Sequence, residues 1–335
     1  MRTLSTPGWV VVLAGALLVS FVLATMVGAV SLPLDLVLDT FRGHLTGSAG
    51  PGPGEFIVWE LRAPRVLLGA AVGAGLAVAG LLVQAAVRNP LGDPYVLGLS
   101  AGASVGAVLV ITSGVFLTLV TPLAAFVSTL LTAVVVYLLA RVRGRLHAGR
   151  MIMAGVALGQ LLGGVTSFLL LRTQDPGAQR QVLFWLLGSL AGAEWSVTVR
   201  TAVVVAALVA VAVVAAGRLN LLVLGDTAAA ALGSDAGRLR ALLLVVIALL
   251  TGTVVAASGG VGFIGLIVPN LTRLLVGADH RRVLPVCALL GALLVVWADT
   301  GARLVLAPTE LPIGILTAAI GVPVFLYLLR RGETA

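Results

Sequence analysis

Long runs of apolar residues, separated by short polar segments, occupy nearly the whole chain. The hydrocarbon core of a bilayer takes roughly 20 apolar residues per helix, and a helix satisfies its own backbone hydrogen bonds in lipid. The pattern therefore predicts an all-α, polytopic membrane protein with about ten transmembrane helices. The expected spans are residues 9–31, 65–87, 95–112, 115–140, 150–172, 197–217, 240–258, 262–277, 283–306 and 312–330.

Three segments depart from this simple pattern. Residues 182–191 are too few to cross a bilayer, so a half-helix that enters from one side is expected before the sixth span. The eighth span follows a glycine-rich segment, residues 258–265, and is interrupted by Pro269. Such an interruption is typical of a helix that starts within the membrane, and a structural kink would explain it equally well. The segment 31–64 is rich in glycine and proline and is expected to be irregular.

Arginine carries all the positive charge of the chain. The 21 basic residues include no lysine, there are 13 acidic residues, and the net charge is +8. The arginines cluster between the apolar runs, as the positive-inside rule describes. With the N-terminus in the cytoplasm, the inner segments hold thirteen arginines and the outer segments hold seven. We therefore expect both termini in the cytoplasm, the segment 31–64 outside, and no nucleic-acid partner.

The composition leaves little room for a soluble domain. Charged residues make up 10% of the chain, whereas soluble domains contain about 25%. One transmembrane domain in the cell membrane is therefore expected over residues 1–335. The first apolar run, from Trp9 to Val30, is longer than the apolar region of a signal peptide, about 7–15 residues. We interpret this run as a retained first span.

Several kinds of chemistry are not expected from this chain. Without lysine it has no Walker A loop, whose lysine contacts the nucleotide phosphates. Cys287 lies alone in an apolar run and the three histidines are scattered, so no metal, cofactor or catalytic residue is expected. The middles of the spans offer no relay of acidic residues or histidines, which argues against proton-coupled transport and against a cation channel. We predict that the chain is not an enzyme.

A polar segment, residues 218–238, interrupts the spans on the arginine-rich side. Its apolar residues form an interrupted helical stripe, and Asp226 could cap a second short helix. Two short helices with one apolar side fit a groove on a partner protein, and a helix lying on lipid is the alternative. The stripe and its glycine breaks are Leu221, Leu224, Gly225, Ala228, Ala231, Leu232 and Gly233.

The fifth predicted span has one small and polar face. Gln160, Gly163, Gly164 and Ser167 follow helical spacing along it. Hydrogen bonds between helices would explain this face, and so would the wall of a wide, weakly polar passage. If the face lines a passage, a second copy or a close paralogue has to supply the other wall.

Other spans carry small residues and one charge pair. Gly69, Gly73, Gly75 and Gly80 in the second span, and Gly98, Gly102 and Gly106 in the third, are typical of closely packed helices. Asp299 and Arg303 lie four residues apart near the outer end of the ninth span, where an ion pair within the helix is expected. Residues 88–91 and residues 268–271 weakly resemble each other, an internal echo of the kind found in transporters built from two similar halves.

Several ordered stretches together resemble the FecCD family, the permease subunits of ABC importers for iron-siderophores, haem and vitamin B12. They cover nearly the whole chain, which makes the combination specific. The stretches are Leu61–Arg65, Asn89–Pro94 with Leu97–Gly102, Ala154–Gly159, Asn220–Gly233, Gly262–Pro269, Asp279–Arg281, Ala298–Asp299 with Ala302–Arg303, and Glu310–Gly314.

The resemblance implies ten spans per subunit, two permease subunits around a central path, two cytoplasmic ABC ATPase subunits and an extracytoplasmic substrate-binding protein. It implies that Leu221–Gly233 forms the coupling helices that contact the ATPase. It also implies that Arg62, Arg65 and Arg303 receive acidic residues of the binding protein, and we expect these arginines to face water at span ends. Asn89, Leu91 and the region around His147 correspond to the inner gate.

The expected function is therefore that of a permease subunit that carries a large metal chelate. A ferric siderophore is expected first, because it is the commonest cargo of the family, followed by haem and cobalamin. An ion-coupled secondary transporter with a regulatory loop and a membrane scaffold that transports nothing are the alternatives from other classes.

Overall fold

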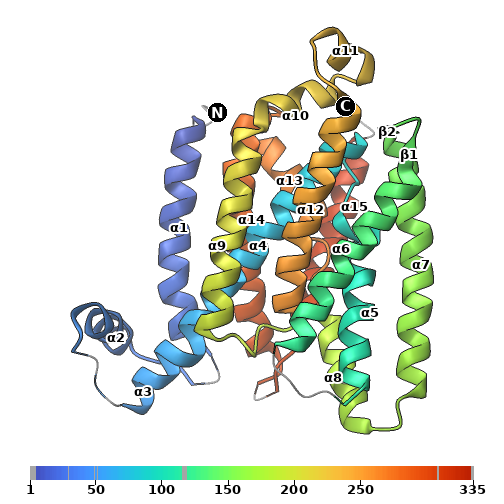
Figure 1. Ribbon diagram of the computed structural model, residues 1–335. Helices are drawn as coiled ribbons and strands as arrows, with labels where there is room; N and C mark the ends of the chain where they lie inside the picture. The colour runs from blue at the N-terminus through green and yellow to red at the C-terminus, as the bar shows by residue number, and fades with distance from the viewer. Residues whose placement is uncertain are drawn as a thin grey trace.

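The computed structural model describes residues 5–28, 30–48, 50, 52–114, 119–307 and 309–332. Helices run up and down between two ends of the molecule, and both described chain ends lie at the same one (Figure 1). The long elements are α1 (Thr6–Met26), α4 (Ala63–Val87), α5 (Leu99–Thr112), α6 (Val120–Ala140), α7 (Ala148–Arg172), α9 (Trp195–Val214), α12 (Ala236–Ser258), α13 (Ile264–Val276), α14 (His280–Val305) and α15 (Ile313–Gly332).

Each of these helices overlaps one predicted span, with bounds that differ by up to five residues, so the prediction of an all-α polytopic fold is confirmed. Seven helices of the described chain are long and apolar enough to cross a bilayer. Helices α5 and α13 are shorter, with 14 and 13 residues. The remaining elements are α2 (Leu34–Thr46), α3 (Pro53–Phe56), the π-helical turn Ile57–Arg62, the 3-10 turn Pro94–Leu97, α8 (Pro176–Leu187), α10 (Ala216–Val223), α11 (Asp226–Ala231), and a hairpin of β1 (Arg141–Val142) and β2 (Arg145–Leu146).

Helix α4 lies at the centre of the fold and is buried along nearly its whole length. Its glycines let neighbouring backbones approach. A Cβ atom added at Gly73 would collide with the carbonyl oxygen of Gly291 on α14, and one added at Gly80 would collide with that of Gly265 on α13. The prediction of close packing is therefore confirmed at these positions. Larger side chains normally keep two helices apart, and glycine lets their backbones come into contact.

The half-helix before the sixth span exists, but its bounds differ from the prediction. Helix α8 begins at Pro176 rather than at residue 182, because the Asp175 carboxylate accepts hydrogen bonds from the backbone of Gly177 and Ala178. The helix ends at Leu187, and the following Gly188 has a φ of 76°, which suits glycine. Residues 182–191, over which the half-helix was predicted, therefore contain only the last part of α8.

The interrupted eighth span is a short helix that follows a non-helical segment. Helix α13 has 13 residues, which at 1.5 Å per residue gives about 20 Å, less than the roughly 30 Å of a hydrocarbon core. The preceding turn meets the end of α8, where the Ser189 amide donates to the Ser258 carbonyl at 2.8 Å and the Gly260 amide to the Trp185 carbonyl at 3.2 Å. The end of α8 thus contacts the end of α12 and the turn that leads into α13. Because α13 starts only after this turn, a helix that begins between the two ends of the molecule is favoured over a simple kink.

The prediction that residues 31–64 are irregular is wrong for much of this segment. Helix α2 buries Val37, and its Phe41 packs near Trp59 with ring centroids 6.0 Å apart. The π-helical turn then continues directly into α4. Apolar positions spaced four apart form this helix in spite of the glycines and prolines that follow it. Within that glycine- and proline-rich stretch, residues 49 and 51 lie outside the described residues.

Candidate functional sites at the two ends of the helices

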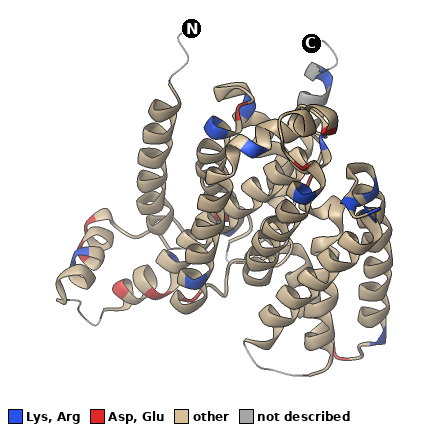
Figure 2. Cartoon of the chain, turned by 45° about the horizontal axis from the view of Figure 1, so that its top comes forward, with Lys and Arg blue, Asp and Glu red and all other residues tan. Residues whose placement is uncertain are grey.

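The predicted pair of short helices, α10 and α11, stands at one end of the molecule beside the β-hairpin (Figure 1). Many of the arginines gather at this end (Figure 2). The two helices are separated at Gly225, whose φ is 102°, and α11 is followed by Gly233, whose φ is 77°. Both glycine breaks are therefore confirmed, because side chains rarely adopt these backbone angles.

Part of the predicted apolar stripe faces outward. Leu224 is 62% exposed and Leu232 is 60% exposed, whereas Leu221 is only half-buried. Leu222 and Ala229 point inward and attach the two helices to the bundle. The outward leucines leave an apolar surface at this end of the chain.

Asp226 does not cap α11 as predicted, because Gly225 takes the N-cap position and no side-chain cap forms there. The carboxylate instead pairs with Arg240 of α12, whose Nη2 lies 2.6 Å from Oδ1 and whose Nη1 lies 2.8 Å from Oδ2. This hydrogen-bonded guanidinium holds the pKa of the Asp226 carboxyl below its usual value.

Arg240 is 1% exposed and connects four segments. Its Nε donates to the Ala86 carbonyl of α4 at 2.9 Å, and its Nη1 donates to the Leu146 carbonyl of β2 at 3.4 Å. Together with the Asp226 pair, these bonds form what we call the Arg240 link. It joins α11 to α12, to the end of α4 and to the hairpin, because one guanidinium offers donors in several directions.

The predicted gate residues lie next to this link. His147 precedes α7, and it lines a hollow of about 400 Å³ together with Asp226 and Gly233. Asn89 closes the turn after α4 by accepting from the Leu91 amide at 2.9 Å. The Asn270 side chain of α13 donates to the Pro90 carbonyl at 3.0 Å, so the two segments of the internal echo touch each other.

At the opposite end, the predicted docking arginines are buried rather than exposed to water. Arg62, Arg65 and Arg303 are 8%, 8% and 7% exposed. The expectation that they face water is therefore wrong. Their guanidinium groups point into the protein because acceptors are available there from α1, α14 and the segment after α14.

Two carboxylates and several carbonyls surround these arginines. Arg65 contacts Asp299 at 2.8 Å and Glu310 at 2.8 Å, and Arg303 contacts Asp299 at 3.3 Å. The predicted Asp299–Arg303 pair within α14 is thus confirmed, and Arg65 completes it. Arg62 donates to the carbonyls of Thr25, Met26 and Val30 at 2.6 to 2.9 Å. We call Arg62, Arg65, Arg303, Asp299 and Glu310 the arginine cluster; its formal charge is +1, three arginines against two carboxylates.

The polar face of the fifth span lies on α7, at the edge of the molecule (Figure 1). Gln160, Gly163, Gly164 and Ser167 are all exposed in the single chain. A Cβ atom added at Gly163 or Gly164 would meet nothing within 4 Å. Packing within this chain therefore does not explain the face, which leaves contact with another chain or with a water-filled passage.

The chain is similar to known proteins over most of its length. The model of the FecCD transport family matches residues 16–331. The Cobalamin import system permease protein BtuC of Halobacterium salinarum is 43% identical over 84% of this chain and 76% of that protein. The Fe(3+) dicitrate transport system permease protein FecD of Escherichia coli is 38% identical over 94% of this chain and 98% of that protein. A solved inward-facing structure of an ABC transporter, assigned to the metal-chelate type, has a TM-score of 0.84 at 30% identity and covers 97% of this chain and 99% of that one.

Proposed function

The chain belongs to the FecCD transport family, and on that premise we propose that it is the permease subunit of an ABC importer that moves a metal chelate into the cytoplasm. It is a transport subunit and not an enzyme. The single observation that carries the ATP-driven mechanism is the pair α10–α11, which presents Leu224 and Leu232 outward and is tied to the spans by the Arg240 link. In this proposal a separate ATPase binds α10–α11, and both chain termini are cytoplasmic.

The Arg240 link supports a route for mechanical coupling. A displacement of α11 by the ATPase pulls on Asp226, and through Arg240 on the end of α4 and on the hairpin before α7. His147 and the turn of Asn89 and Leu91 follow these two segments directly. We therefore propose that they form the inner gate.

At the other end, we propose that the arginine cluster receives an acidic residue of an extracytoplasmic binding protein. Its surplus positive charge supports this role, because one more carboxylate would neutralise it. Burial adds to the attraction, since charge interactions strengthen where water is excluded.

We propose that the polar face of α7 lines the path together with a second copy of this chain or a close paralogue. The exposed Gln160 and Ser167, with bare backbone at Gly163 and Gly164 between them, support a path that is wide and weakly polar. A single chain offers only one wall.

The cargo we propose is a metal chelate, with a ferric siderophore as the first candidate and cobalamin as the second. The similarity to an Fe(3+) dicitrate permease supports the first, and that to a cobalamin permease supports the second. Calorimetric titration of the cognate binding protein with a ferric siderophore, haem and cobalamin tests the choice, because the binding protein selects the cargo.

The ATPase contact is tested with Leu224→Glu, in the chain reconstituted with its ATPase and binding protein. A charged side chain on the exposed apolar surface should lower ligand-stimulated ATP hydrolysis at least tenfold, while membrane insertion stays normal. Leu45→Glu, which changes an exposed leucine of α2 at the opposite end of the molecule, serves as the matched control. Normal hydrolysis by the Leu224 variant would show that the ATPase binds elsewhere.

A further inference from the structure

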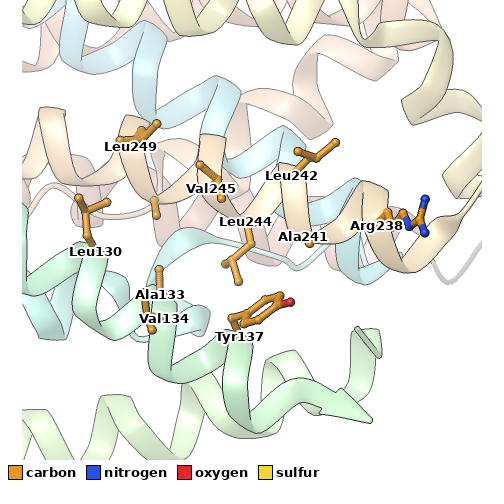
Figure 3. Close-up of a pocket in the computed structure, with 11 residues that line it drawn as sticks. Leu130, Ala133, Val134, Tyr137, Arg238, Ala241, Leu242, Leu244, Val245 and Leu249 are labelled. Carbon is orange, nitrogen blue, oxygen red and sulfur yellow. The ribbon is translucent and has the colours of Figure 1, made fainter. Parts of the chain in front are cut away.

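An apolar groove runs between α6 and α12 (Figure 3). Its volume is about 700 Å³. The lining consists of aliphatic side chains, with the Tyr137 ring and Arg238 as the exceptions. The lining residues are Leu130, Ala133, Val134, Tyr137, Arg238, Ala241, Leu242, Leu244, Val245, Ala248 and Leu249.

Water is a poor occupant for this groove. At about 30 Å³ per molecule the space would hold roughly 20 water molecules, and each would need polar partners that the aliphatic walls lack. Both helices are long and apolar enough to cross a bilayer. Hydrocarbon chains surround such helices, so an acyl chain fits the walls of the groove.

Arginines gather where the groove reaches the arginine-rich end. Arg238 lines that end from α12, and its side chain is exposed. On the opposite wall, the Arg141 guanidinium carbon lies 5.7 Å from the centre of the Tyr137 ring. Arg145 packs beside Gly237 at the start of α12. Arg238 and Arg141 thus flank the mouth of the groove, while Arg145 lines the separate hollow beside Asp226.

Little in the described chain neutralises these cations. Asp235 contacts Arg238 at 3.4 Å across the surface of one helix, and an exposed pair of this kind contributes little. Arg238 and Arg141 therefore retain a net positive charge beside one carboxylate. A lipid headgroup with a net negative charge therefore suits the mouth of the groove better than a zwitterionic headgroup does.

From the apolar groove and the charged mouth together we propose that the α6–α12 groove binds one anionic phospholipid. One acyl chain lies between Ala133 and Ala241, and the headgroup phosphate contacts Arg238 and Arg141. The site depends on membrane insertion and not on the proposed transport function, so the two can fail separately.

Native mass spectrometry of the detergent-solubilised full chain tests the proposal, with an equimolar mixture of phosphatidylglycerol and phosphatidylcholine as the probe. The wild-type chain should retain one phosphatidylglycerol in preference to phosphatidylcholine. Because a basic residue near a membrane surface contributes roughly fivefold in anionic lipid binding, Arg141→Gln with Arg238→Gln should lower this retention at least tenfold. The double variant Arg218→Gln with Arg282→Gln removes two exposed arginines at the same end and should change nothing.

A second variant tests the groove itself. Ala241→Phe fills the space between the walls and should reduce the retention of both lipids, with the melting temperature measured as a check on folding. Equal retention by wild type and the Arg141/Arg238 variant would overturn the proposal. An equal loss of phosphatidylglycerol from the Arg218/Arg282 control variant would also overturn it. If Ala241→Phe changed the oligomeric state of the chain without any loss of lipid, the occupant of the groove would be a second protein chain and the proposal would be wrong.

Discussion

The arginine cluster and the Arg240 link occupy the two ends of α4 and use arginine differently. Arg65 stands in the first turn of α4, and the carbonyl that Arg240 binds, that of Ala86, stands in the last turn. In the link, one arginine meets one carboxylate, and its other donors reach backbone carbonyls of two other segments. In the cluster, three arginines share two carboxylates.

This difference in charge balance separates an internal connection from a site that can accept a further group. The charges of Arg240 and Asp226 balance, so the link serves to hold segments of one chain together. The cluster keeps a positive surplus, and its member Glu310 is half-exposed, so an approaching anion is attracted to it.

Loss of the link should have the largest effect. Arg240→Met leaves the Ala86 and Leu146 carbonyls without this donor, and each buried group left unpaired costs about 1–3 kcal/mol. We expect a lower melting temperature and at least a tenfold loss of ligand-stimulated ATP hydrolysis. Arg282→Met, at an exposed arginine of the same end, is the control. If Arg240→Met hydrolysed ATP normally, the link would have no part in coupling.

In the cluster, two substitutions should act in opposite directions. Arg62→Gln removes the surplus charge while its amide can still donate to a carbonyl, so association of the binding protein should slow about fivefold to tenfold at low salt. Glu310→Gln raises the surplus and should accelerate association. Stopped-flow mixing at low and high salt measures both, and both effects should fade as salt screens the charges. A change of the same sign for the two variants would contradict the surplus-charge model.

The polar face of α7 lies between the end with the arginine cluster and the end with the Arg240 link. Its accessibility to water tests whether a passage connects the two ends. Cysteines introduced at Gln160, Gly163 and Ser167 should react with a water-soluble maleimide, and their labelling rates should change severalfold with the nucleotide state of the ATPase. Cysteines at Leu158 and Leu162, both half-buried, should stay protected. The reverse pattern would identify the polar face as a dry contact between chains.

The smallest expected effect is the pH dependence of the link. Because Arg240 lowers the pKa of Asp226, the pair stabilises the folded chain fully above the unfolded-state pKa of about 3.9 and loses this contribution as pH falls through the lowered folded value. The difference in melting temperature between wild type and Asp226→Asn should therefore be constant near neutral pH and shrink below about pH 4. A difference that grows towards acidic pH would contradict this assignment.

The spans and the glycine breaks could be predicted from the sequence, because hydrophobic length and backbone conformation are local properties. The pair Asp299–Arg303 was also predictable, since four residues of a helix bring the two side chains together. Gly225 and Gly233 were visible for the same reason, as they permit angles that other residues avoid. Each of these signals lies within a few neighbouring residues.

The remaining contacts depend on how distant segments meet. Arg65 and Asp299 are 234 residues apart, and nothing in either neighbourhood specifies the other. Asp226 looks like a helix cap in isolation, and only the fold brings Arg240 against it. Arginines at span ends suggest exposure, but the carbonyls of Thr25 and Val30 turn Arg62 inward. Helix α2 was missed because glycine and proline nearby obscured its apolar spacing.

The glycine contacts of α4 restrict which helices can move. A helix whose backbone touches two neighbours, through Gly73 and Gly80, can neither roll nor slide without driving a side chain into a carbonyl oxygen. With α13 and α14 it therefore forms a closely packed unit, which we expect to move as one body. A Cβ atom added at Gly155 of α7 would collide with the Val96 carbonyl oxygen, whereas one added at Gly163 or Gly164 would meet no neighbour within the chain. We therefore expect movement in the second half of α7 rather than in its first half.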